Sequence, residues 1–238
     1  MKDKGYNQEH YDKLKEGVES WNEWRKANPT IQPLLRGAYL REAQLDGADL
    51  REAYLRGANL WGAYLRGANL WGAYLREAYL REAHLSKANL ERADLREAHL
   101  WKADLREAYL RKVHFWGAYL READLREAHL REANLWKANL ERADLREAHL
   151  WNADLREADL READLWGAYL REANLERADL READNLTVGQ ICKTKTLYRA
   201  KLGVELEKQT KEKCPRKLIQ WKGETCKSGR ELEGGMNK

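Results

Sequence analysis

The sequence predicts an all-β solenoid, in which short strands wind around one axis, and two observations carry this prediction. From residue 38 to residue 184 the chain repeats one five-residue unit, Ala-x-Leu-x-x, and Leu stands at the centre of 28 of 29 successive units. Ala stands two residues before that centre in 28 of the 29. The two exceptions, Val113 and Phe115, fall in the same unit, which predicts a local repacking of the core near the middle of the repeats.

A five-residue period excludes a long helix and a long flat strand. Five residues advance an α-helix by about 500°, so successive Leu side chains would scatter around the helix axis. In a flat strand an odd period sends alternate Leu side chains to opposite faces. Ala and Leu of one unit are two residues apart and share a strand face. If the chain turns a corner after each unit, every Ala and Leu points inward and the other three positions point outward.

The repeat units resemble the pentapeptide-repeat family, as in ADLRE at 48–52 and ANLWG at 58–62. The flanking segments GVESWNEWRKANP and LTVGQICKTKTLYRAKL are similar to the flanks of bacterial members of that family. The resemblance covers about 147 of the 238 residues. It implies a right-handed quadrilateral β-helix with four units per coil, of about seven coils here, with short α-helical caps at both ends. Glycine at the last unit position fits corners that need a positive φ.

Both flanks are predicted to form caps, because an uncovered solenoid end exposes backbone groups and the apolar core. A helix is expected over 7–27, starting at an Asn cap and placing four apolar residues on one face. Those residues are Tyr11, Leu14, Val18 and Trp21.

After residue 184 the repeat frame slips by one residue. A short helix capped by Thr187 is expected through Thr194, and a second from about Val204 to Lys213, ending before Pro215. The segments are then a cap with lead-in at 1–37, the β-helix at 38–184, a helical cap at 185–221 and a flexible tail at 222–238. We expect one structural domain with two caps.

Charge is distributed unevenly along the chain, whose formal net charge is +4. The repeats hold 24 Lys and Arg against 28 Asp and Glu, whereas residues 185–238 hold 13 against 6. The basic end has two interpretations: a solubilising tail, or a weak contact with nucleic acid or an acidic partner. Overall we expect no nucleic-acid partner and no membrane partner. Self-association through the terminal caps is an alternative that the sequence leaves open.

The cysteines and the hydropathy favour a cytoplasmic protein. Cys192, Cys214 and Cys226 are odd in number and lack metal-ligand spacing, so reduced thiols are expected. No apolar run resembles a signal peptide or a membrane span.

The outward positions contain two candidate interaction surfaces, which follow from twenty residues per coil. Trp61, Arg81, Trp101 and Arg121 alternate in one column, which favours a cation–π ladder. Because the seven repeat tryptophans spread over all four columns, a structural role at the corners is the alternative. The candidate tryptophans are Trp61, Trp101, Trp116 and Trp136.

Aspartates form the second candidate surface, a column of stacked carboxylates. Its candidate members are Asp104, Asp124, Asp144 and Asp164, with Asp184 next in the column. Arginines lie two residues after the first three of them, on the same outer side. A track for a cation or polycation is one hypothesis, and a solvated, internally paired face is the other.

The histidines are not expected to form a metal site. His129 and His149 are expected to stack between Tyr109 and Tyr169, about 5 Å apart. No carboxylate or Cys is stacked beside them to complete a tetrahedral ligand set, so we expect no metal and no cofactor. The other repeat histidines fall in other columns, and all five are expected at the surface.

The sequence predicts a non-enzymatic protein. The repeats contain one Ser, no Thr and no Cys, and there is no Gly-rich phosphate loop and no clustered nucleophile–base pair. The favoured function is a rigid scaffold for an unknown protein partner. The resemblance adds an alternative, a DNA-mimicking gyrase binder, but mimicry of DNA needs a strongly negative surface. The nearly balanced repeats do not supply one, and the looped insertions of the quinolone-resistance members are missing.

Overall fold

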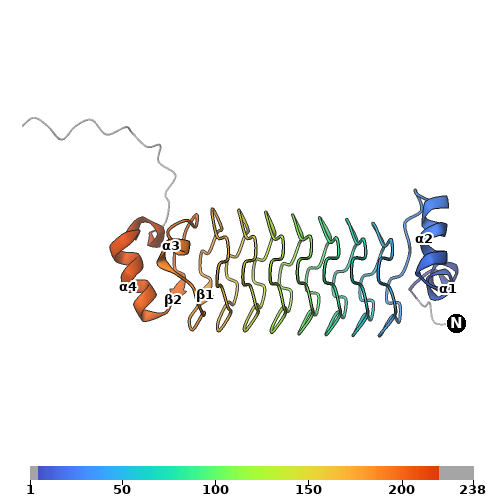
Figure 1. Cartoon of the computed structure of the whole chain (residues 1–238), viewed down its shortest axis with the longest axis horizontal. Helices are drawn as coiled ribbons and strands as arrows, with labels where there is room; N and C mark the ends of the chain where they lie inside the picture. Colours follow the sequence, from blue (N-terminus) through green and yellow to red (C-terminus); the bar gives the residue numbers. More distant parts are fainter. Residues whose placement is uncertain (1–4, 220–238) are drawn as a thin grey trace, which may run out of the picture.

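The computed structural model describes residues 5–219, which form a rod with helices at both ends (Figure 1). Parallel β-bridges join residues that are 20 apart in sequence, as in Asp104 with Asp124 and Tyr54 with Tyr74. Each turn of the rod therefore takes four five-residue units. The expected tail at 222–238 lies outside the described residues.

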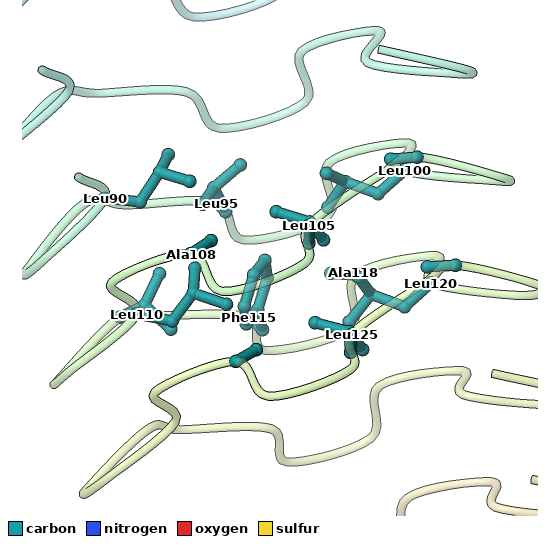
Figure 2. Close-up of a cluster of buried hydrophobic side chains, with 14 of the residues drawn as sticks. Leu90, Leu95, Leu100, Leu105, Ala108, Leu110, Phe115, Ala118, Leu120 and Leu125 are labelled. Atoms are coloured by element: carbon teal, nitrogen blue, oxygen red, sulfur yellow. The ribbon is translucent and has the colours of Figure 1, made fainter. Parts of the chain in front are cut away.

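Alanine and leucine fill the inside of the rod. From Leu45 to Leu180 the Ala and Leu of the repeats are at most 3% exposed. Val113 and Phe115 are fully buried among them, and Figure 2 shows the Phe115 ring between leucines of its own and neighbouring coils. The enlarged unit is therefore accommodated inside the same continuous core.

Each corner is a tight turn closed by a backbone hydrogen bond from the next Ala to the preceding Leu, as from Ala58 N to Leu55 O at 2.9 Å. The residue before each Ala has a positive φ, for example 65° at Gly57 and 56° at Glu52. Glycine fits this conformation, but most corners hold Glu, Lys or Arg, for which it costs roughly 1 kcal/mol. Bonds to the neighbouring coils hold these residues in place, as from Glu52 N to Trp71 O at 2.9 Å.

The outward residue before each Leu stabilises the wall in two ways. Asn and Asp accept a bond from the backbone N–H two residues later, as Asn59 Oδ1 does from Trp61 N at 3.2 Å. Aromatic rings stack on the ring one coil away, as Tyr54 does on Tyr74 with centroids 4.7 Å apart. The wall is thus ordered by side chains as well as by the backbone ladder.

The N-terminal flank forms two helices, α1 (Gln8–Lys15) and α2 (Val18–Ala27), where the sequence predicts one. The predicted cap is present, because the Asn7 side chain accepts from His10 N at 3.0 Å. The break falls at Gly17, whose φ of 119° is incompatible with a continuous helix. Leu14 and Trp21 of the predicted apolar face are nevertheless buried.

Helix α2 covers the open edge of the first coil with polar side chains. Trp21 Nε1 donates to Asp49 O at 2.8 Å, and Asn22 bonds both Gly47 O and Asp49 N. The buried Arg25 donates to Arg51 O at 3.1 Å. These bonds satisfy backbone groups that a preceding coil would otherwise satisfy.

The C-terminal flank contains β1 (Asp179–Leu180), α3 (Val188–Ile191), β2 (Lys201–Leu202) and α4 (Val204–Lys213), followed by a 3-10 helix at Pro215–Leu218. Strand β2 pairs in parallel with β1 and extends the wall beyond the repeats. Thr187 and Gln190 form a reciprocal capping box at α3. Helix α3 ends at Ile191, before the predicted Thr194, whereas α4 has the predicted bounds.

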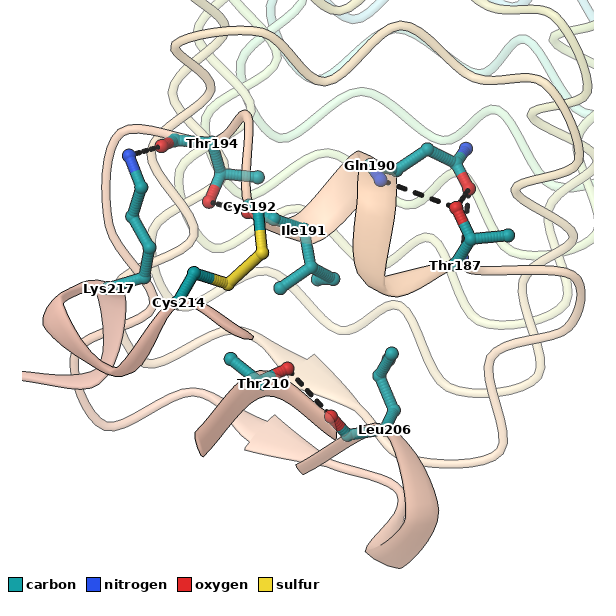
Figure 3. Close-up of a disulfide and its surroundings, with 9 residues drawn as sticks. All are labelled: Thr187, Gln190, Ile191, Cys192, Thr194, Leu206, Thr210, Cys214 and Lys217. Carbon is teal, nitrogen blue, oxygen red and sulfur yellow. Dashed lines mark hydrogen bonds between the residues drawn. A yellow bond between two sulfur atoms is a disulfide. The ribbon is translucent and has the colours of Figure 1, made fainter. Parts of the chain in front are cut away.

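Cys192 and Cys214 form a disulfide that joins the end of α3 to the end of α4 (Figure 3). This corrects the expectation of reduced thiols for these two residues. They are 22 residues apart, and each directly follows the end of a helix, so the packing of α4 beside α3 brings them together. Cys226 lies outside the described residues. Among residues 5–219, no helix has the length and apolar character needed to span a bilayer.

Candidate interaction surfaces

Trp61 and Trp101 belong to a tryptophan–arginine ladder, which we define as Arg41, Trp61, Arg81 and Trp101. The Arg41 guanidinium lies 4.3 Å from the Trp61 ring centroid. Arg81 lies between the two rings, 5.2 Å from Trp61 and 4.7 Å from Trp101. Arg121, the next residue of the column, instead contacts Glu122 and Glu141. The predicted alternation therefore forms a ladder of four side chains and ends at Trp101.

Trp116 and Trp136 stack on each other in a different column, with ring centroids 5.9 Å apart. Lys137 and Arg156 lie 4.9 and 5.7 Å from the Trp136 ring. The Trp116 Nε1 atom is buried without a hydrogen-bond partner among the described residues. All four candidate tryptophans are half-buried, so they form two separate pairs and not one continuous patch.

The four candidate aspartates stack in one column, which we call the aspartate ladder, and arginines pair with them. Arg106 donates to both Asp104 carboxylate oxygens at 2.8 and 2.7 Å, and its Nε lies 3.6 Å from Asp124 of the next coil. Arg126 and Arg146 repeat this arrangement one and two coils further on. Asp164 ends the series, accepting from Trp166 N and from Asn185.

The arginine contacts favour the ionised form of two of these carboxylates, Asp104 and Asp144. Burial alone would raise the pKa of Asp104, but bonds from the side chain and backbone of Arg106 outweigh burial and lower it. The same balance lowers the pKa of Asp144 beside Arg146. The structure therefore matches the hypothesis of an internally paired face, in which arginines already occupy the carboxylates.

His129 and His149 stack between Tyr109 and Tyr169, as the column predicts. The two imidazole centroids are 5.0 Å apart at right angles, and the flanking rings lie 5.1 and 4.9 Å away. Burial and the neighbouring His129 lower the pKa of His149. Within residues 5–219, no three His, Cys, Asp or Glu side chains are grouped as metal ligands.

A hollow that the repeat pattern does not predict lies where the repeats meet the C-terminal cap. Three columns gain a last bridge there, namely Asp164 to Asp184, Asn174 to Thr196 and Asp179 to Lys201. In the fourth column the residue 20 after Tyr169 lies in α3. The Gln190 side chain there donates to Leu165 O and Ala168 O at 2.8 and 3.0 Å. A helix thus replaces one side of the coil and leaves a gap in the wall.

This gap, the C-terminal notch, has a volume of about 640 Å³. Its principal lining residues are Trp151, Tyr169, Arg171, Gln190, Lys193 and Lys217. Trp151 and Tyr169 are 42% and 46% exposed, and their rings stand at 86° with centroids 6.2 Å apart. Figure 3 shows Gln190, Cys192 and Lys217 around α3, with Lys217 donating to the Thr194 carbonyl. The notch combines exposed aromatic rings with cations.

The charge around the notch is positive. Arg171 and Lys193 are exposed, and neither has an ion pair within the described part of the chain. Glu172 is the single carboxylate that residues 5–219 contribute to the lining. Residues 185–219 carry nine Lys and Arg against three Asp and Glu, so the cap beside the notch adds to the positive potential.

A rod of stacked five-residue units, closed by side chains of terminal helices, defines a repeat-solenoid protein, and comparisons with known proteins identify the family. The model of pentapeptide repeats matches residues 34–72, 73–111, 88–126, 108–146, 123–161 and 158–184, which together span more than half of the chain. The chain therefore belongs to the pentapeptide-repeat family.

Solved structures of this family are similar to the chain. HetL, a protein involved in heterocyst differentiation regulation from Nostoc sp. strain PCC 7120, is 38% identical, with 62% of this chain and 76% of HetL covered and a TM-score of 0.47. Rfr23 from Cyanothece 51142 is 37% identical, covering 41% of this chain and 61% of Rfr23, with a TM-score of 0.36. QnrB1, a plasmid-mediated fluoroquinolone resistance protein, is 20% identical over 71% of this chain and 91% of its own, with a TM-score of 0.37. No curated protein matches this chain.

Proposed function

We propose that this protein is a rigid, non-enzymatic scaffold that binds another protein. In this proposal the segment at 38–184 is a right-handed quadrilateral β-helix of about seven coils, with caps at 1–37 and 185–221. The observation that supports it most directly is the filled core, because inward Ala and Leu leave only the outer wall to carry function. We propose that it acts in the cytoplasm on the hydropathy alone, because the Cys192–Cys214 disulfide removes the argument from reduced thiols.

The ordered outer wall suits recognition by shape. Side chains repeat at the coil spacing and are held by stacks and bidentate pairs, so little conformational entropy would be lost when a partner binds. Exposed tryptophan and tyrosine supply contact area of the kind found at binding hot spots. We propose that the candidate tryptophans contribute more to such a surface than the aspartate ladder, whose carboxylates are already bonded to arginines.

Affinity capture with the intact rod as bait tests the proposal. HetL is a suitable control bait, because it is also a pentapeptide-repeat protein but is only 38% identical to this chain. We expect at least one protein to be enriched on this rod over HetL and to bind directly as a purified protein, with a Kd of about 10 μM or tighter. Equal recovery on both baits would contradict a specific scaffold role.

The DNA-mimicking alternative predicts a surface of free carboxylates in place of phosphates. The arginine partners of the aspartate ladder speak against it. A supercoiling assay with purified gyrase separates the two proposals, and we expect neither inhibition nor protection at micromolar protein. Inhibition that is lost on adding charge-reversing substitutions to the aspartate ladder would favour the alternative.

A further inference from the structure

We propose that the C-terminal notch binds an acidic peptide segment of a protein partner, with one aromatic or aliphatic side chain of that segment inserted in it. This inference rests on the proposed scaffold function and assigns a site and a partner chemistry to it. The notch is the place where aromatic rings, cations and an interrupted wall coincide.

The shape of the notch fits an apolar anchor. Its floor includes the buried side chains of Ala168 and Leu170, and Trp151 and Tyr169 form two walls at nearly a right angle. Tyr169 is held from below by His149, with ring centroids 4.9 Å apart. A volume of about 640 Å³ is within the usual range of ligand sites. An aromatic or branched side chain can therefore be enclosed by surfaces that are already in place.

The charges select an anionic segment. Arg171, Lys193 and Lys217 line the notch with one carboxylate of the described chain, Glu172, among them. Unlike the arginines of the aspartate ladder, Arg171 and Lys193 have no ion-pair partner within residues 5–219. Carboxylates on either side of the anchor would form charge-assisted hydrogen bonds with them. The same cations would repel a basic segment.

The interrupted wall favours an extended peptide over a compact ligand. Tyr169 ends its column of bridges in the described chain, whereas the other three columns gain a further bridge, to Asp184, Thr196 and Lys201. A peptide in extended conformation can lie across the notch beside Tyr169. Gln190 and Lys193 already bond the edge groups Ala168 O and Glu172 N, so side chains would hold the peptide more than strand addition would. The anchor then enters the notch beside the Tyr169 ring.

Fluorescence anisotropy of the full chain with a short labelled peptide tests the inference. The probe is rich in aspartate and has one central phenylalanine, and the comparison peptides replace the aspartates by lysine or the phenylalanine by glycine. We expect saturable binding of the probe, weakened roughly tenfold or more by either replacement. Equal binding of all three peptides, or no binding, would overturn the inference. So would tighter binding of a single-stranded oligonucleotide than of the probe.

A matched pair of variants locates the site. Tyr169→Ala with Arg171→Glu alters the notch, and Tyr109→Ala with Arg111→Glu makes the same changes three coils away in the same column. The two tyrosines are 46% and 48% exposed, and both arginines are exposed. We expect the notch variant to lose roughly tenfold in affinity and its control to bind as the wild type does. Equal loss in both would place the peptide elsewhere.

Lys193→Glu provides a second test that leaves the aromatic rings intact. Its side chain is exposed, so we expect normal folding by circular dichroism together with weaker probe binding. A specific partner captured by a rod that does not bind the probe would refute the inference but leave the scaffold proposal standing. Probe binding with the expected variant effects, but no captured partner, would support the notch as a peptide site and contradict the scaffold proposal.

Discussion

Residues 87–101 and 137–151 have identical sequences but different surroundings, and the difference shows what determines the surface of this rod. They are 50 residues apart, which is two and a half turns, so they lie on opposite sides. His99 stacks in parallel between Tyr79 and Tyr119, with interplanar angles of 7° and 10°. Its counterpart His149 meets His129 and Tyr169 edge to face. Identical local sequence therefore does not give an identical surface.

The last residue of each identical segment, Trp101 or Trp151, also has surroundings that depend on the neighbouring coils. Arg81 and Lys102 lie over the Trp101 ring, which is half-buried. Trp151 also has an arginine one coil before it, but that residue, Arg131, contacts Glu132 at 3.3 Å. Trp151 remains 42% exposed and lines the C-terminal notch. Residues 20 positions away, and the acidic groups near them, decide whether a tryptophan supports the wall or is available to a partner.

The largest expected effect is on the free energy of unfolding, and here the two identical segments should behave alike. Leu90→Ala and Leu140→Ala each remove a fully buried side chain that has leucines in the same position one coil before and one coil after it. We expect each to lower the free energy of unfolding by about 2–5 kcal/mol, and the two losses to agree within about 1 kcal/mol. Urea unfolding measures both. A much larger difference would mean that the core, like the surface, depends on position along the rod.

The copies should differ in the effect of tryptophan removal. Trp101→Ala removes two cation–π contacts and a half-buried ring, so we expect a loss of about 1–2 kcal/mol in the free energy of unfolding. Trp151→Ala removes a more exposed ring, and we expect a loss below about 1 kcal/mol. The same urea titrations measure the difference. Losses in the opposite order would contradict the support that we assign to Arg81.

Much of the fold follows from the period, because inward and outward positions are set within each five-residue unit. Once four units per coil are assumed, the columns follow too, and they place Trp61 near Arg81 and Asp104 near Arg106. The helix break at Gly17 does not follow from the pattern, because an apolar face continues through it from Leu14 to Trp21 and gives no sign of an interruption.

The notch could not be predicted from the repeats themselves. It exists because α3 takes the place of one side of a coil, and the capping signal at Thr187 predicts a helix without saying which column it interrupts. The pairing of Cys192 with Cys214 has the same origin, since the packing of α4 beside α3 brings these residues together. The structure between the repeats and the C-terminal cap depends on how the coils and the helices pack together, and the five-residue period does not describe that packing.

The smallest expected effect is the loss of stability in mild acid that comes from His99 and His149, the histidines of the two identical segments. Burial lowers the pKa of both His99 and His149, reinforced by the charge of Arg81 at the first and of His129 at the second. A histidine with a lowered pKa in the folded state binds protons more readily when unfolded. Its contribution to stability is therefore complete above the unfolded pKa of about 6.5 and is lost as the pH falls through the folded value.

We accordingly expect the free energy of unfolding to decrease between about pH 7.5 and pH 5.5, and His99→Gln and His149→Gln each to reduce that decrease. His10, whose pKa burial also lowers, should maintain the remaining pH dependence in both variants. Because the two copies lie on opposite sides of the rod, the double variant should combine the two reductions additively. Urea titrations at the two pH values measure this. An unchanged pH dependence in either variant would show that the ring arrangement around that histidine leaves its proton affinity unaltered.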